Sequence, residues 1–267
     1  MEATRIAKVA SERGVTLRLL GGIAFRLRNP SSLSENLRRH YVDIDFVGLR
    51  KQRKQIEALF TELGYFPRTT FNALNGLSRL IFNDIENERR VDIFLNVFEM
   101  CHKLDFTDRL KLDSQTLPLA DLLLTKLQVY EITEREYKDV IALLKDHRLG
   151  EVDDANTINQ AYIAKLTSSD WGLWRTIILN LERLDERLDS YLRDHQHQSE
   201  VRAKIAQLKK RIEQEPKSMG WKIRARVGDK VKWYELPEAD REVVDSRPAS
   251  ERVGDGQGKT LSEGSEA

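Results

Sequence analysis

Apolar residues in the first half of the chain alternate between the spacing of strands and the spacing of helices. Apolar runs predict strands at 15–20, 41–47, 65–71, 77–83 and 89–98. Helical spacing predicts helices at 4–13 and 51–63, and the start of another at 23–27. Asn75-Gly76 predicts a tight hairpin turn between two of the strands. We therefore expect a mixed sheet with flanking helices, which is an α+β fold.

The second half is predicted to be helical. Pro118 suits the first turn of a helix, and Thr133 with Glu136 has the form of a capping box. Farther on, Asp170 can cap a long helix that carries a leucine stripe, and the stripe resumes at 201–212. These two stripes fit either a helical hairpin or one long helix.

The C-terminal part differs in pattern from the helical region. Residues 221–236 alternate between apolar and basic positions around Gly228-Asp229, which predicts a small hairpin. Residues 246–267 are rich in Ser, Gly and charge without apolar periodicity, so we expect disorder there. The expected organisation is a sheet-containing domain, a helical domain, a small basic hairpin segment and a tail, at 1–116, 117–215, 216–245 and 246–267.

Three carboxylates are predicted to gather on one face of the sheet. Asp43 and Asp45 are two residues apart on a predicted strand, so they share a face. On another predicted strand Val91 and Ile93 point to the core, so Asp92 between them points to the opposite face. If the two strands are neighbours, all three carboxylates lie together. Carboxylates at such distances raise one another's pKa unless a cation lies among them, and hard divalent ions prefer oxygen ligands. The pattern predicts a metal site that holds two ions.

A diglycine follows the first apolar run. Gly21 and Gly22 lack Cβ atoms, so the backbone can turn tightly and a phosphate can approach its N–H groups. Helical spacing resumes at 23–27, which places the glycines at a helix N-terminus, where the dipole favours anions. This segment is a candidate cradle for a triphosphate.

These motifs, in this order, resemble the nucleotidyltransferase superfamily that shares the DNA polymerase beta palm fold. That pattern is Gly-Gly or Gly-Ser after the first strand, Asp-x-Asp on the second and a third Asp on a later strand. Here the positions are Gly21-Gly22, Asp43 with Asp45, and Asp92. Within the superfamily the chain looks most like AbiEii-type enzymes, which include toxins of bacterial toxin–antitoxin and abortive-infection systems. The resemblance covers about residues 1–150 and implies a palm domain at 1–116.

The resemblance also implies roles for three further residues. In that family a Lys on one helix and an Asp on the next complete the site, which carries these roles to Lys126 and Asp139. An Arg often precedes the Asp-x-Asp motif, and Arg39 matches it. All three would contact the nucleotide or support its contacts. A lysine is a point charge suited to a phosphate.

Composition limits the classes of protein and of partner. The formal net charge is +1, so no bulk electric field drives binding to nucleic acid or to a membrane. One cysteine, Cys101, excludes an intramolecular disulfide and a cysteine-based zinc cluster. Without an apolar leader or a long uncharged apolar run, the expected location is cytoplasmic, with no membrane partner. Residues 202–232 carry eleven Lys or Arg against three Asp or Glu, which fits an RNA surface or a solvated face equally well.

The expected reaction is Mg²⁺-dependent transfer of a nucleoside monophosphate from a nucleoside triphosphate to an acceptor, with release of pyrophosphate. Asp43 and Asp45 would hold two Mg²⁺ ions, and Asp92 would share one ion and help to deprotonate the acceptor hydroxyl. The resemblance implies tRNA or another RNA as acceptor and a cognate antitoxin as partner. Other branches modify protein hydroxyls or small molecules such as aminoglycosides. The alternative class is a palm-fold module that binds nucleotide or RNA without turnover.

Overall fold

Five strands form the central mixed sheet of this computed structural model, which describes residues 2–34, 36–41 and 43–236. Across the sheet the strands are β1 (Leu17–Leu20), β2 (Ile44–Gly48), β5 (Arg89–Leu95), β4 (Arg79–Asp84) and β3 (Phe66–Pro67). The pair β2 and β5 is parallel, and the other neighbouring pairs are antiparallel. The predicted mixed sheet is confirmed.

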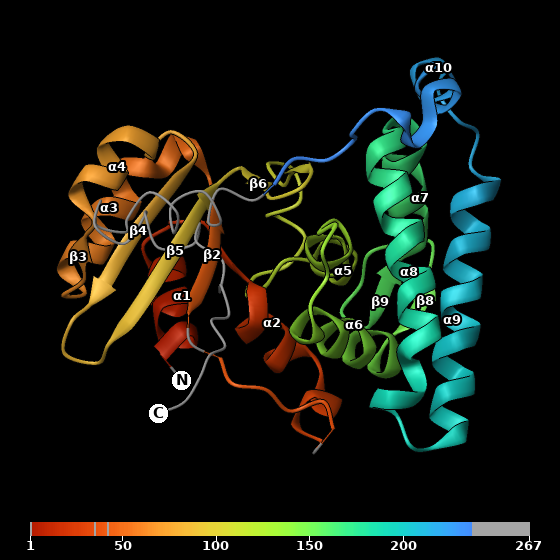
Figure 1. Cartoon of the computed structure of the whole chain (residues 1–267). Helices are drawn as coiled ribbons and strands as arrows, with labels where there is room; N and C mark the ends of the chain where they lie inside the picture. The colour runs from red at the N-terminus through yellow and green to blue at the C-terminus, as the bar shows by residue number, and fades with distance from the viewer. Residues whose placement is uncertain (1, 35, 42, 237–267) are drawn as a thin grey trace, which may run out of the picture.

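One face of the sheet is apolar and covered by helices. Ile44, Phe46 and Ile93 are buried on this face, as the alternation along β2 and β5 predicts. Helix α3 (Arg53–Glu62) packs here, where the ring of Phe60 stacks on that of Phe82 with 4.8 Å between centroids. Helices α1 (Glu2–Glu12) and α4 (Thr69–Asn75) belong to the same half of the molecule (Figure 1). The opposite face of β2 and β5 is mixed, because it carries aspartates as well as the buried Val47 and Phe94.

The sheet differs from the prediction at 65–71 and at Asn75-Gly76. Only Phe66–Pro67 is a strand, helix α4 follows, and Gly76 ends that helix instead of closing a hairpin. The reason lies in Asn72, whose side chain accepts from the backbone N–H of Ile81 at 2.8 Å and donates to its carbonyl at 3.0 Å. Beyond the short pairing with β3, these two bonds take the place of a strand neighbour at Ile81. The hairpin instead connects β4 to β5.

Helices fill the second half of the chain, as predicted. They are α5 (Leu119–Leu127), α6 (Glu134–Asp146), α7 (Gln160–Ser169), α8 (Trp171–Tyr191) and α9 (His195–Gln214). The capping box of Thr133 and Glu136 opens α6, and the side chain of Asp170 caps α8. The two leucine stripes form a helical hairpin of α8 and α9. The two halves of the chain contact each other where α2 (Gly21–Arg28) packs against α5 and α6 (Figure 1).

Short elements complete the described chain. Strands β6 (Val97–Glu99) and β7 (Lys103–Asp105) form a hairpin after β5. Strands β8 (Arg148–Gly150) and β9 (Thr157–Asn159) form a parallel pair between α6 and α7. Three 3₁₀ turns lie at Pro30–Leu33, Arg50–Gln52 and Gly228–Lys230.

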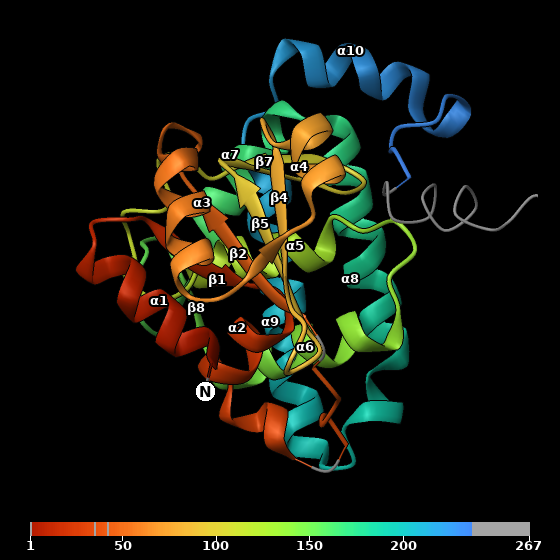
Figure 2. The same ribbon diagram turned by 90° about the vertical axis from the view of Figure 1, so that its left-hand side faces the viewer.

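The predicted hairpin at 221–236 is wrong, because this segment begins as helix α10 (Met219–Val227). Ser218 caps the helix by accepting from the N–H of Trp221, whose ring packs edge-on against Trp174 at 5.0 Å. This local cap and aromatic contact favour helix over the alternating pattern. The chain then returns toward β6 (Figure 1), where the N–H of Glu235 donates to the Cys101 carbonyl at 3.1 Å. Figure 2 shows α10 at one edge of the molecule.

The boundaries expected between the four parts of the chain stay a prediction. The disorder expected at 246–267 lies outside the described residues. Within the described chain, every helix is too short or too polar to cross a lipid bilayer.

Candidate active site

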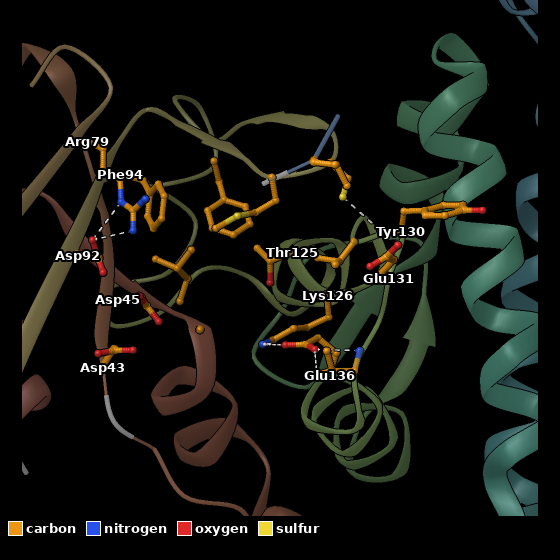
Figure 3. A pocket seen from close by; sticks show the side chains of 18 of the residues that line it. Asp43, Asp45, Arg79, Asp92, Phe94, Thr125, Lys126, Tyr130, Glu131 and Glu136 are labelled. Carbon is orange, nitrogen blue, oxygen red and sulfur yellow. Dashed lines mark hydrogen bonds and ion pairs between the residues drawn. The ribbon is translucent and has the colours of Figure 1, made fainter. Parts of the chain in front are cut away.

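The three predicted aspartates lie on one side of the sheet, at one wall of a cavity. Asp45 on β2 pairs in register with Asp92 on the parallel neighbour β5, so their side chains emerge side by side. Asp43 lies just before β2, which begins at Ile44 and is shorter than predicted. All three line the cavity (Figure 3). The strand pairing thus brings together two motifs 47 positions apart in the sequence.

The cavity has a volume of about 660 Å³ and separates the sheet from α5 and the start of α6. This volume lies within the usual range of about 300–1,000 Å³ for small-molecule sites. Lys126, Tyr130 and Glu136 line the wall that faces the aspartates (Figure 3). A wall with three aspartates and two arginines therefore faces a wall with one lysine and two glutamates, across a space of ligand size.

Asp45 is the electrostatically strained member of the group. It is partly buried and forms no hydrogen bond or ion pair with any described residue. Burial and the neighbouring charge of Asp92 raise the pKa of Asp45 to about 7, and Lys126 opposes this shift. A carboxylate in this state gains free energy from a cation placed beside it.

Asp92 is already neutralised by two arginines that the sequence reasoning missed. Arg79 on β4 places Nη2 at 2.9 Å and Nε at 3.0 Å from Oδ1 of Asp92. Arg90 on the same strand as Asp92 places Nε at 3.0 Å from Oδ2. The position of Arg90, two residues before Asp92 on a strand, was a usable signal. Arg79 was not predictable, because only the pairing of β4 with β5 brings it near.

The diglycine begins helix α2, as predicted, and each glycine makes room for a neighbouring side chain. A Cβ atom on Gly21 would lie 2.0 Å from Oδ2 of Asp45, and Gly21 has a φ of +63°. A Cβ atom on Gly22 would lie 2.2 Å from Nη2 of Arg39. The glycines are therefore needed for the packing of the site, whether or not a phosphate also approaches them.

The side chains of Lys126 on α5 and Asp139 on α6 form an ion pair between two successive helices. Nζ of Lys126 lies 3.1 Å from Oδ2 of Asp139 and 3.5 Å from Oε1 of Glu136. Arg39 donates two hydrogen bonds to Asp139, of 2.8 Å from Nε and 2.7 Å from Nη2. Lys126 lines the cavity, whereas Arg39, Gly22 and Asp139 lie outside its lining. Asp139 thus holds Lys126 and Arg39 in place from behind the cavity wall.

The carboxylate oxygens of this site are donor atoms that a divalent metal ion prefers, but not all of them are available to bind one. Asp43 and Asp45 offer carboxylate oxygens that no described residue occupies, and burial together with the charge of Asp92 raises the pKa of Asp45. Both oxygens of Asp92 are engaged by arginines. Accordingly, the part of the chain that the structure describes contains no group of three or more His, Cys, Asp or Glu side chains arranged to hold one ion.

The basic region 202–232 is largely engaged within the protein. Seven of its eleven Lys and Arg residues contact acidic groups, carbonyls or aromatic rings of the described chain, for example Lys209 with Glu182 at 3.0 Å and Arg211 with Glu151 at 3.3 Å. The four without such a contact among described residues are Lys210, Lys222, Arg226 and Lys230. Seven of the eleven basic residues thus have partners within the protein, and two of these, Arg202 and Lys209, join α9 to α8.

Comparison with known proteins gives no family assignment: the chain matches no protein-family model and no curated protein sequence.

Proposed function

We propose that this protein is a Mg²⁺-dependent nucleotidyltransferase with a polymerase-beta-type palm, in which Asp43, Asp45 and Asp92 form the catalytic centre. The supporting observation is that Asp45 and Asp92 lie in register on parallel strands and face Lys126 across a cavity of about 660 Å³. This arrangement combines acidic groups for metal ions with a cation for a phosphate, as phosphoryl transfer requires.

Each residue has a defined task in this proposal. Bound Mg²⁺ ions would stabilise the attacking and leaving oxygens during transfer. Asp43 and Asp45 would hold the ions, and Asp92 would share one of them and help to deprotonate the acceptor hydroxyl. Lys126, fixed by Asp139, binds the triphosphate and stabilises the charge of the departing pyrophosphate. The N–H groups at the start of α2 add donors for the phosphates.

The acceptor in this proposal is tRNA or another RNA, and the biological role is that of a toxin in a toxin–antitoxin or abortive-infection system. The second candidate is a palm-fold module that binds nucleotide or RNA without turnover. One observation favours this second candidate, namely that both oxygens of Asp92 are bound by arginines.

The test is a transfer assay with the full chain. The protein is incubated with each radiolabelled nucleoside triphosphate, Mg²⁺, and total RNA, total protein or an aminoglycoside. We expect label on RNA with the wild type and none with Asp45→Asn. The matched control is Asp108→Asn, which changes an exposed aspartate outside the cavity. Label on no acceptor, together with measurable nucleotide binding, would favour the binding module.

A further inference from the structure

We propose that Arg79 is a displaceable counter-cation of Asp92. It holds this carboxylate while no metal ion is bound, and it leaves Asp92 for a substrate phosphate when a divalent cation takes its place. This inference rests on the proposed function. It assigns Arg79 the part of a positioning residue that couples metal binding to nucleotide binding.

Arg79 and a metal ion compete for the same atom of Asp92. Arg79 contacts Oδ1 of Asp92 through both Nη2 and Nε, at 2.9 Å and 3.0 Å. The Asp92 side chain is only 6% exposed, so little of it is left for another ligand. A metal ion that binds Oδ1 must therefore displace Arg79.

Arg79 has a second space within reach. Arg90 is the more exposed of the two side chains, at 40% against 20%, but it lines the main cavity and not the second one. Arg79 lines the main cavity and also a second one of about 280 Å³ beside it. Its guanidinium lies over the ring of Phe94 at 4.9 Å, which is a surface along which a planar cation can slide. Figure 3 shows Arg79 beside Phe94 at the edge of the main cavity.

The exchange leaves no charge without a partner. Asp92 would replace an arginine with a divalent ion, and Arg79 would replace a carboxylate with a phosphate. Arginine binds both groups through the same pair of parallel N–H donors. Removing one partner of a buried ion pair is costly because it leaves a charge unpaired, and the exchange avoids this cost. Metal binding without nucleotide is therefore opposed by Arg79, and metal binding with nucleotide is not.

The experiment measures binding by calorimetry with the full chain, using Mn²⁺ as the metal probe and a non-hydrolysable ATP analogue as the nucleotide probe. Arg79→Gln should bind Mn²⁺ about tenfold more tightly than the wild type in the absence of nucleotide. With saturating Mn²⁺, the same variant should bind the analogue about tenfold more weakly. Opposite changes in the two affinities are the signature of an exchanged arginine, and a purely structural role would not produce them.

Two further variants make the test specific. Arg50→Gln removes a positive charge from the second cavity without a contact to Asp92, so its Mn²⁺ affinity should stay within about twofold of the wild type. Arg79→Lys keeps the charge but loses the paired donors, so it should bind Mn²⁺ about threefold more tightly than the wild type. It also serves as the test variant if Arg79→Gln does not fold.

The outcomes separate this inference from the proposed function. If the wild type binds Mn²⁺ and the Arg79 variants bind it equally or more weakly, Arg79 is a fixed partner of Asp92 and the inference is wrong. The proposed function then stands. If the wild type binds no Mn²⁺ with or without nucleotide, the proposed function itself is overturned, and this inference with it.

Discussion

Gly21 and Asp45 are packed so closely that a methyl group on Gly21 would lie 2.0 Å from Oδ2 of Asp45. The turn into α2 is therefore shaped by the carboxylate beside it, and this carboxylate is the one whose pKa is raised to about 7. Phosphate binding is not required to explain a glycine here. The contact connects the diglycine and the Asp-x-Asp motif in one structural unit.

Gly21→Ala is expected to displace Asp45 and to lower transfer activity about 100-fold, because a misplacement of about 1 Å at a reacting centre has this effect. It should also reduce the free energy of unfolding by about 2–4 kcal/mol, because a φ of +63° is unfavourable for alanine and the methyl group clashes. Transfer assays and urea unfolding measure the two effects.

The matched control is Gly14→Ala. Gly14 has a φ of +69°, but a Cβ atom there would meet nothing within 4 Å. This variant should lose about 1 kcal/mol through backbone strain alone and keep its transfer activity. Equal activity of the two variants would show that the Asp45 contact does not matter for the site.

Asp45→Asn is expected to change how stability depends on pH in the metal-free protein. The folded pKa of Asp45 is about 7, above its value of 3.8 in the absence of shifts, so the folded state holds the proton more tightly than the unfolded state. The wild type should therefore lose stability as the pH rises from about 4 to about 7, by an amount on the order of 3 kcal/mol. Asparagine does not titrate, so the variant lacks this loss.

The measurement is urea unfolding at pH 5 and pH 8 in the presence of a chelator. Asp45→Asn should be more stable than the wild type at pH 8, and the difference should shrink at pH 5. Adding Mn²⁺ at pH 8 should stabilise the wild type and have less effect on the variant. A difference that is the same at both pH values would contradict the raised pKa.

Lys126→Ala should weaken nucleotide binding about tenfold or more and leave acceptor binding nearly unchanged, because the lost charge faces the cavity. Calorimetry with a non-hydrolysable nucleotide measures this. The companion variant Asp139→Asn leaves Lys126 and Arg39 without their shared partner, so it should destabilise the fold by about 3 kcal/mol. Unchanged nucleotide affinity of Lys126→Ala would make Lys126 a purely structural ion-pair partner.

RNA binding is predicted to depend on the basic residues that remain free among the described ones. Neutralising Lys210, Lys222, Arg226 and Lys230 together should lower the slope of log affinity against log salt concentration by about three. Neutralising Lys209 and Arg211 should instead reduce stability, because both are paired with glutamates of other elements. A salt slope equal to that of the wild type in the first variant would favour an acceptor other than RNA.

The sequence by itself determined the local parts of this protein. Strand periodicity was sufficient to place Asp45 and Asp92 on the polar side of their strands, because side-chain direction alternates with every residue. The capping signals at Thr133 and Asp170 located two helix starts correctly, because such hydrogen bonds span only a few residues. The diglycine was correctly placed at the start of a helix.

The tertiary structure decided what depends on contacts between distant segments. Helix α4 replaces part of a predicted strand because the Asn72 side chain bonds to the backbone of β4. Helix α10 replaces a predicted hairpin, although apolar and basic residues alternate there as they do in strands. Arg79 reaches Asp92 only through the pairing of β4 with β5. Local periodicity carries no information about which partner a side chain meets across the fold. The carboxylates could therefore be predicted from the sequence, but the arginines that bind one of them could not.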